Sequence, residues 1–488
     1  MESILRKCFY SLILSLLYFQ NRAFGSEINV PLPVLQVNLD PTKLYDQSSL
    51  WVGRHIHCQL TRKTQSEIVL EAAAKIEYLN SQELRMIIGS NFRFSDGSEI
   101  LAADVIASFN FFKKFRNSYR AQFDLVSGIE AIDRKTVKFK FRDSSAKLFL
   151  SFYSTSHNPI LQKSYVENYS VKDAKLKNPL GCGNYKVSEY TPGVKISLVS
   201  SFLNERKINF YFRANTEITF EELSKFDLVH LNIKDFEASS KKINADFREA
   251  KLFDPYHIVL GLNSRSENWK DRERRCALFS RLTTDSPLRS YGESALPASD
   301  LFPKGVVGFN SDQNFHSYYK AQTFSGKFSD NFCVSFVSAS IPDFRQASFE
   351  HMFSTLFKAV RKLNIVNPVN FGQTFLNQNC DGIVIGFKSN NLDGADFLNV
   401  FTEETVNYSG FWSDDLKKKI IQAQTLKEIS VRASAFQEIS ELIRNQCLIF
   451  PVLTVPYKTF YLKRSKVFPD IEKSVLNEYY LGQVNEVK

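Results

Sequence analysis

The chain has 488 residues, of which 43% are apolar, 23% charged and 14% aromatic, a composition that excludes a disordered or coiled-coil protein. Because a single core stops growing near ~250–300 residues, this length predicts two or three domains. The formal charge of +10 comes from scattered basic residues with no basic stripe interleaved with aromatics, so we expect no nucleic-acid partner.

The first 25 residues differ from the rest of the chain. Arg6 and Lys7 form a short basic start, residues 8–19 are an almost uninterrupted apolar run, and small residues within 23–25 fit a cleavage site. The run is shorter than the ~20 residues that cross a bilayer. We therefore expect a cleavable signal peptide over residues 1–25 and export to the periplasm.

The cysteines that follow this segment are even in number. Their number and the oxidising compartment predict one or more disulfides, but spacing does not choose among the many possible pairings. The residues concerned are Cys58, Cys182, Cys276, Cys333, Cys380 and Cys447.

In the first half, residues 91–96 are extended and lead into an Asp-Gly pair at 96–97, which is typical of a tight turn. A helix is predicted from about Ala102, with apolar side chains recurring on one stripe. Residues 135–142 alternate Thr, Val and Phe with Lys, which predicts a half-buried strand.

The second half has the pattern of an α/β domain. Residues 332–337 are predicted as a strand, 349–363 as an amphipathic helix of about four turns, and 365–371 and 382–387 as two further strands. A strand–helix–strand unit of this kind crosses over right-handed. The helix is predicted from apolar residues at helical spacing, namely Phe349, Met352, Phe353, Leu356, Val360 and Leu363.

Two helices and a strand are predicted near the end. Ser413 is placed as the N-cap of a helix with an acidic first turn. A second helix spans the apolar positions 436–443. Residues 448–455 then return as a strand that Pro451 interrupts.

Catalytic signatures are almost absent from the sequence, which contains no GxSxG, HExxH, GxxxxGK or GxGxxG motif. Ser144 and Lys147 form an SxxK pattern, and Lys458 with Thr459 matches part of a KTG motif, but Phe460 stands at the required glycine. An exported serine hydrolase is therefore kept only as an alternative, and we expect that the protein is not an enzyme.

His55, His57 and Cys58 are the closest grouping of residue types that bind metals. A structural zinc site needs four ligands, and no second cluster or CxxC pair accompanies these three. Adjacent glutamate pairs have diverging side chains, so a hydrolytic site with two carboxylates is not supported. We expect no metal and no cofactor, and the residues favour a binding protein over an enzyme.

The block at 91–112, NFRFSDGSEILAADVIASFNFF, resembles a signature of the family 5 extracellular solute-binding proteins, the oligopeptide-, dipeptide- and nickel-binding group that serves ABC importers. The residues that carry the resemblance are Phe94, Asp96, Gly97, Ala102, Asp104, Val105 and Ser108. Other blocks stand in family order, so that the similarity covers nearly the whole mature chain: NLDP at 38–41, NPLGCGNYKVSEYTPG at 178–193, LGLNSRSENWKDRERRCAL at 260–278 and NYSGFWSDDLKKKIIQAQ at 407–424.

This resemblance implies an α/β fold of the periplasmic-binding-protein type, with two lobes, a discontinuous lobe I and an inserted subdomain. Gly181 and Gly183 suit a tight backbone where the chain passes between domains. Lobe I is expected at 26–45, 178–255 and 455–488, the inserted subdomain at 46–177, and lobe II at 256–454.

The resemblance also implies a ligand in the cleft between the lobes. In peptide-binding members, an aspartate that neutralises the ligand's α-amino group stands where this chain has Asn390, and some place an arginine where it has Val384. Because asparagine offers hydrogen bonds without charge, we expect a neutral or anionic polar ligand rather than a free peptide. The expected lining residues are Tyr45, Gln47, Tyr119, Phe387, Lys388, Asn390, Asn391, Tyr408 and Trp412.

The implied function is that of an exported solute-binding receptor of an ABC importer. It would capture a small polar molecule or a short peptide by cleft closure and present the closed form to a permease in the inner membrane. We expect a monomer. Besides the serine hydrolase, the alternative is a transport-inactive scaffold that binds a protein or a cell-wall fragment.

Overall fold

The computed structural model describes residues 27–32, 34, 36–44, 46–64, 67–115, 120–155, 157–169, 180–201, 206–213, 222, 225–232, 247–250, 255–284, 296–321, 328, 330–337, 343–365, 371–389, 392–402 and 406–462. The predicted signal at 1–25 and most of the predicted segment 455–488 lie outside these residues. The described strands form two four-stranded sheets, one eight-stranded sheet and a two-stranded hairpin. No helix in the described ranges has the length and hydropathy that a membrane crossing needs.

The first four-stranded sheet lies in the region predicted as lobe I. Its strands are β1 (Glu27–Leu32), β10 (Lys207–Phe212), β9 (Lys195–Ser200) and β8 (Tyr185–Thr191), in that order, and β1 runs parallel to β10. After the 3-10 helix η1 (Pro41–Lys43), helix α2 (Gln47–Ile56) packs on this sheet, with the Trp51 ring 5.6 Å from the Phe210 ring. A small core therefore holds α2 against the sheet.

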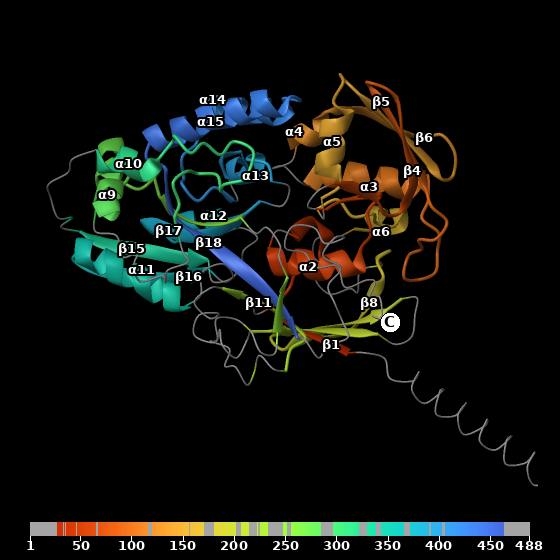
Figure 1. Ribbon diagram of the computed structural model, residues 1–488, viewed down its shortest axis with the longest axis horizontal. Helices are drawn as coiled ribbons and strands as arrows, with labels where there is room; N and C mark the ends of the chain where they lie inside the picture. Colours follow the sequence, from red (N-terminus) through yellow and green to blue (C-terminus); the bar gives the residue numbers. More distant parts are fainter. Residues whose placement is uncertain are drawn as a thin grey trace, which may run out of the picture.

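The second four-stranded sheet lies in the predicted inserted subdomain, where helices cover one of its faces (Figure 1). Phenylalanine dominates the core between them: the Phe109 ring lies 5.4 Å from Phe123 and 6.0 Å from Phe139. The elements of this region are β2 (Thr61–Lys63), β3 (Ile68–Leu70), β4 (Ala73–Asn80), β5 (Glu83–Ile88), α3 (Ala102–Phe115), α4 (Arg120–Asp124), β6 (Val126–Ala131), β7 (Thr136–Phe141), α5 (Ala146–Tyr153) and α6 (Lys163–Glu167).

The large sheet has the strand order β11-β18-β13-β17-β15-β16, with β12 and β14 also paired to β18. Its strands are β11 (Leu228–Asn232), β12 (Phe247–Ala250), β13 (Pro255–Leu262), β14 (Leu296–Pro297), β15 (Asn331–Val337), β16 (Ala359–Ile365), β17 (Gly382–Lys388) and β18 (Ile449–Leu462). The helices around it are α9 (Arg272–Thr284), α10 (Phe315–Lys320), α11 (Asp343–Leu356), α12 (Phe371–Asn377), α13 (Ala395–Leu398), η5 (Asn399–Phe401), α14 (Asp414–Thr425) and α15 (Ile429–Asn445).

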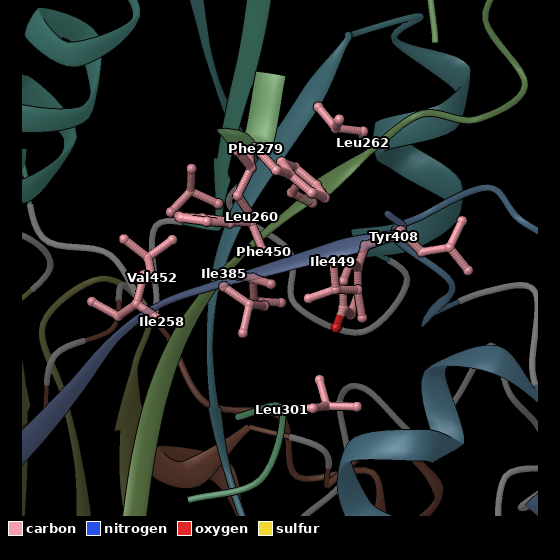
Figure 2. Packing of buried hydrophobic residues seen from close by; sticks show 14 of the residues in the cluster. Ile258, Leu260, Leu262, Phe279, Leu301, Ile385, Tyr408, Ile449, Phe450 and Val452 are labelled. Carbon is pink, nitrogen blue, oxygen red and sulfur yellow. The ribbon is translucent and has the colours of Figure 1, made fainter. Parts of the chain in front are cut away.

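Side chains of three neighbouring strands build the centre of the large core (Figure 2). Leu260 on β13, Ile385 on β17 and Phe450 on β18 are almost completely buried there. Phe279 of α9 closes the core from outside the sheet, with its ring 5.4 Å from the Phe450 ring. This cluster fixes the sheet from which the candidate site projects.

Strand β18 passes through two parts of the molecule (Figure 1). Its first half pairs with β13 and its second half with β11 and β12. A bulge interrupts the β13 ladder where Pro451 opposes Val259, because proline has no N–H to donate. The predicted boundary between 454 and 455 therefore falls inside one continuous strand.

The turn and helix predicted after residue 90 are present. Gly97 adopts a φ of +88°, and its N–H donates to the Phe94 carbonyl. One carboxylate oxygen of Asp104 accepts the Leu101 N–H at the start of α3, and the other accepts the Lys163 N–H at the start of α6. The predicted N-cap at Ser413 is also confirmed, since its Oγ accepts the Leu416 N–H.

The helix predicted over 349–363 is wrong at both ends. Helix α11 begins at Asp343 and ends at Leu356, and the chain then forms β16 over Ala359–Ile365. Strand β16 pairs in parallel with β15 along its whole length, so inter-strand hydrogen bonds override the apolar spacing that Val360 and Leu363 share with a helix. The strand predicted over 365–371 accordingly lies earlier, and Phe371 begins α12 instead.

Three disulfides join the six cysteines in a pairing that spacing did not reveal: Cys58–Cys182, Cys276–Cys447 and Cys333–Cys380. The first of these links the end of α2 to the glycine block ahead of β8. At the same place, the Gly183 N–H donates to the Ile56 carbonyl and the Ser95 N–H donates to the Gly181 carbonyl. Several segments that are distant in sequence are therefore tied together here.

We expect Gly181→Ala to destabilise the fold by about 3 kcal/mol or more, because the closest atom to the added Cβ would be the Ile56 carbonyl oxygen, a backbone atom 1.9 Å away. Gly128→Ala is the matched control, since its Cβ would meet only Lys140 at 3.9 Å, and we expect a change within about 1 kcal/mol. Chemical denaturation of both variants measures the difference. Equal stability of the two variants would contradict the tight packing described here.

Candidate functional site

The candidate site begins where β17 ends. This strand runs parallel to β15, and in open α/β sheets ligands bind beyond the carboxyl ends of such strands. Ser389 and residues 392–396 follow in the chain and lead into α13, which lies on the side of the large sheet that faces the predicted inserted subdomain (Figure 1). The residues of this segment are therefore the first candidates for contact with a solute.

A polar network holds the described part of this segment in place. The Asp393 N–H donates to Ser389 Oγ (3.1 Å), and Ser389 Oγ donates to Asp396 Oδ2 (3.0 Å). The Arg432 guanidinium of α15 forms an ion pair with Asp393 at 3.0 Å, and both side chains are largely buried. Removing one partner would leave a charge in a poorly solvated place, so this network fixes the position of the segment.

An aromatic wall stands beside the network. The Phe387 ring lies 5.3 Å from Tyr408 and 6.4 Å from both Phe371 and Phe397. Tyr408 is only 1% exposed, and burial raises the pKa of its phenol above the usual value. Two residues predicted to line the cleft, Phe387 and Tyr408, are therefore brought together, with Tyr408 on the core side of the wall.

Two glycines make room for aromatic rings on the two faces of the sheet, and one of these rings is Tyr408 of the wall. A Cβ on Gly386 would lie 1.6 Å from the Tyr256 hydroxyl oxygen, and one on Gly261 would lie 2.4 Å from the Tyr408 ring. Any larger residue at these positions would push an aromatic ring out of place. The glycines thus leave space for the Tyr256 ring on one face of the sheet and for the Tyr408 ring on the other.

The other predicted lining residues are placed less fully. Trp412 is 41% exposed and has the Lys417 ammonium 4.9 Å from its ring centroid, a cation–π contact at the surface. The backbones of Gln47 and Lys388 are described, in α2 and at the end of β17, but their side chains are not. Tyr45, Tyr119, Asn390 and Asn391 lie outside the described residues. Their contact with a ligand stays a prediction.

The predicted inserted subdomain contributes a cation near the network formed by Ser389, Asp393, Asp396 and Arg432. Lys63, at the end of β2, donates from Nζ to Ser151 Oγ of α5 at 3.1 Å. Burial lowers the pKa of Lys63, while the charges of Asp393 and Asp396 raise it and that of Arg432 lowers it. The Lys63 ammonium therefore lies in the electric field of the lobe II network.

A second cation extends from predicted lobe II toward the predicted inserted subdomain. Lys427, between α14 and α15, lies 3.3 Å from Asp143 Oδ2 and donates to Ser144 Oγ at 3.0 Å. The serine of the SxxK pattern is thus paired with a lysine of lobe II. Lys458 and Thr459 lie in β18, where they pair with β11. The geometry gives no support to a Ser/Lys catalytic pair.

The sequence alone did not single out Lys63, Asp393, Asp396 or Arg432. An acidic residue before a glycine, directly after a predicted strand, was a usable signal for Asp393. Lys63 and Arg432 have no such signal, because they are distant in sequence from the loop that they face. Only the fold brings the four residues into one region.

The histidine pair is structural. His55 Nδ1 lies 2.8 Å from the Trp51 carbonyl, and its ring lies 5.7 Å from Tyr185. Burial lowers the pKa of both His55 and His57 to about 4, and Cys58 is held in a disulfide rather than available as a thiolate. Within the described part of the chain, no group of three or more His, Cys, Asp and Glu side chains is arranged to hold a metal ion.

A cavity of about 550 Å³ lies at the other edge of the large sheet, beside the amino ends of β15 and β17. Asp381 in its wall is already engaged, since it accepts the Trp269 Nε1–H and the Cys333 N–H. Arg265 donates to the Gly410 carbonyl. Because its lining residues lie at the amino ends of β15 and β17, the cavity is at the opposite end of these strands from the candidate site.

Comparison with known families identifies the chain. Residues 80–323, half of its length, match the family model of the bacterial extracellular solute-binding proteins, family 5 Middle. The chain belongs to this family.

Solved structures share the fold over almost the whole chain. The Escherichia coli murein tripeptide binding protein MppA, 16% identical, covers 94% of this chain and 98% of its own, with a TM-score of 0.77. The unliganded open form of MppA, 17% identical, covers 94% and 97% with a TM-score of 0.58. The Helicobacter pylori binding protein DppA in complex with the peptide STSA, 18% identical, covers 96% and 100% with a TM-score of 0.75. These likenesses confirm the α/β periplasmic-binding-protein-like fold.

Curated relatives align over a shorter stretch. A putative binding protein of Brucella melitensis is 28% identical over 105 residues, which are 21% of this chain and 17% of the relative. The peptidoglycan-binding protein YepA of Agrobacterium fabrum is 29% identical over 110 residues, 22% of this chain and 18% of its own. The aligned stretch thus spans less than a fifth of either relative.

The buried histidines predict how stability depends on pH. His55 and His57 have pKa values of about 4 and His257 of about 3 in the folded protein, all lowered first by burial, whereas an unfolded imidazole titrates near ~6.5. The unfolded chain therefore binds more protons below ~6.5, and stability falls as the pH is lowered from there toward ~4. Each imidazole contributes a slope of up to about 1.4 kcal/mol per pH unit.

We expect His57→Asn to reduce the change of the free energy of unfolding per pH unit by the contribution of one imidazole. This holds whether or not the substitution also lowers stability equally at every pH. His351→Asn is the control, because His351 is exposed on α11. Urea unfolding at a series of pH values between 4 and 7 measures both slopes. An unchanged slope in the His57 variant would mean that this imidazole is not buried in its neutral form.

Proposed function

We propose that the protein is a periplasmic receptor that captures a small polar solute between two lobes and delivers it to an ABC importer. The observation that carries this proposal is the match of its fold, over 94% of the chain or more, to binding proteins that include a peptide complex. Family membership supports the same reading. Export through a cleaved signal, a monomeric state and a permease partner in the inner membrane are parts of the proposal.

Cleft closure is the proposed mechanism. One body consists of the sheet around β1 with the inserted subdomain, and the other is the unit built on β13, β15 and β17. A ligand that contacts both bodies has a higher affinity for the closed arrangement, and this difference shifts the equilibrium toward closure. The polar residues that follow β17 supply groups to one side of the proposed cleft, and Lys63 supplies a cation to the other side.

The proposed ligand is peptide-like, with cell-wall peptides as the first compounds to test. Two similar proteins are described by their names as binding murein tripeptide and peptidoglycan. Asn390 argues for a ligand whose amino terminus carries no charge, since an uncompensated ammonium is costly to bury. An N-acylated peptide meets this condition.

The serine hydrolase alternative is not favoured, because the Ser144 hydroxyl is engaged by Lys427. The transport-inactive scaffold has the same binding chemistry as the receptor and differs only in its partner. Uptake of the bound compound by cells with and without this protein distinguishes the two.

We expect at least one compound in a panel of free peptides, N-acylated peptides and muropeptides to bind with one molecule per chain. At about 100 times its Kd, such a compound raises the free energy of unfolding by about 2.7 kcal/mol. Differential scanning fluorimetry detects this shift, and small-angle scattering of the same samples detects compaction on closure. A panel in which no compound changes the melting temperature or the scattering profile would refute the receptor function.

We expect Asn390→Asp to change which amino termini the protein accepts. A new charge-assisted hydrogen bond of about 1.5–3 kcal/mol would raise the affinity for a peptide with a free amine about 10- to 100-fold. The affinity for the same peptide after acetylation should not increase. Isothermal titration of both peptides measures this selectivity.

Asn391→Asp is the matched control, because it adds the same charge one position away. Equal gains in the two variants would indicate a general electrostatic effect rather than a specific amine site at residue 390.

A further inference from the structure

The contact of Lys427 with Asp143 and Ser144 joins two parts of the chain that are 283 residues apart. Asp143 and Ser144 precede α5 in the predicted inserted subdomain, and Lys427 lies between α14 and α15 of predicted lobe II. Asp143 also accepts a hydrogen bond from Ser145 Oγ. The Ser145 bond is the main cause that lowers the pKa of Asp143, and the bond from Lys427 lowers it further, so the carboxylate is charged at neutral pH.

The surroundings of this contact have complementary charges. On lobe II, Asp393 and Asp396 face the cation of Lys63, whereas on the inserted subdomain Asp143 faces the cation of Lys427. Each side thus offers both a cation and an acid to the other. Such a reciprocal pattern favours one alignment of the two surfaces over shifted ones.

Helix packing accompanies the charges. Helix α4 of the predicted inserted subdomain lies against α14 of predicted lobe II (Figure 1), and Lys427 follows directly after α14 in the chain. Strand β18, which joins the two bodies through its backbone ladders, runs along a different side (Figure 1). A rotation about the β18 region would separate α4 from α14 and break the Lys427 contacts, because they lie away from the axis.

We propose that Lys427, Asp143 and Ser144 form an electrostatic latch that stabilises the closed arrangement of the lobes before a ligand arrives. The latch rests on the proposed cleft closure and adds to it a bias that comes from the protein itself. It sets how much of the ligand's binding free energy is needed for closure and therefore tunes affinity without touching the ligand.

The latch is weak because both of its charged side chains are partly exposed to solvent. The Lys427 side chain is 35% exposed and the Asp143 side chain 57%, so water and salt screen the pair. Exposed ion pairs of this kind change an equilibrium about 1.4- to 5-fold. A contribution of this size biases closure yet lets the cleft open for exchange.

The test measures the distance between spin labels at Ser81→Cys, in the turn between β4 and β5, and at Ser434→Cys on α15, in ligand-free protein. We expect Lys427→Ala and Asp143→Asn each to lower the closed-to-open ratio about 1.4- to 5-fold. The same variants should weaken binding of a panel compound by a similar factor. Raising the ionic strength to about 1 M, where the Debye length is about 3 Å, should remove most of the difference from the parent protein.

Lys418→Ala is the matched control, because this substitution removes the same charge. Lys418 is exposed on α14 and forms no ion pair with the described residues. The exchanged pair Asp143→Lys with Lys427→Asp should restore part of the closed population. The latch is wrong if Lys427→Ala and Asp143→Asn match Lys418→Ala at low salt. Failure of the receptor function is a different outcome, in which no panel compound shortens the distance in the parent protein, while the ligand-free populations still report on the latch.

Discussion

The backbone ladders of β18 are the constraint on which the rest of the structure depends. One strand pairs first with β13, in the core of the large sheet, and then with β11 and β12 at the far end. The ladders on both halves of β18 tie the core of the large sheet to β11 and β12 of predicted lobe I, so the proposed closure would bend the molecule in this region. The position of β17 relative to β11 and β12 depends on this strand, because β13 pairs with both β17 and β18.

Much of the local structure follows from the sequence, and the exceptions have a physical cause. The turn at Gly97, the helix after it and the N-cap at Ser413 depend on interactions between near neighbours, so a local pattern is enough to predict them. The boundary between α11 and β16 depends instead on pairing with β15. An apolar spacing contains no information about a strand that approaches from elsewhere, and the helix was therefore extended too far.

The candidate site shows the same division. Family blocks predict Phe387 and Tyr408 as lining residues, and the structure packs their rings together, while their contact with a ligand stays a prediction. The ionic groups of this region were not predicted, since Lys63, Arg432 and Lys427 come near Asp393 and Asp143 only in the folded chain. Contacts of high sequence separation leave no trace in a single sequence. The disulfide pairing escaped prediction for the same reason.

The Cys58–Cys182 bridge has a mechanical consequence for any opening movement. Together with the close backbone contacts of Gly181 and Gly183 with the end of α2, it ties the sheet around β1 to the predicted inserted subdomain. In the proposed closure these two parts would move together, and the bending would fall on the joint around β18. Making the joint around β18 more rigid would then be enough to block the proposed opening and the exchange of ligand.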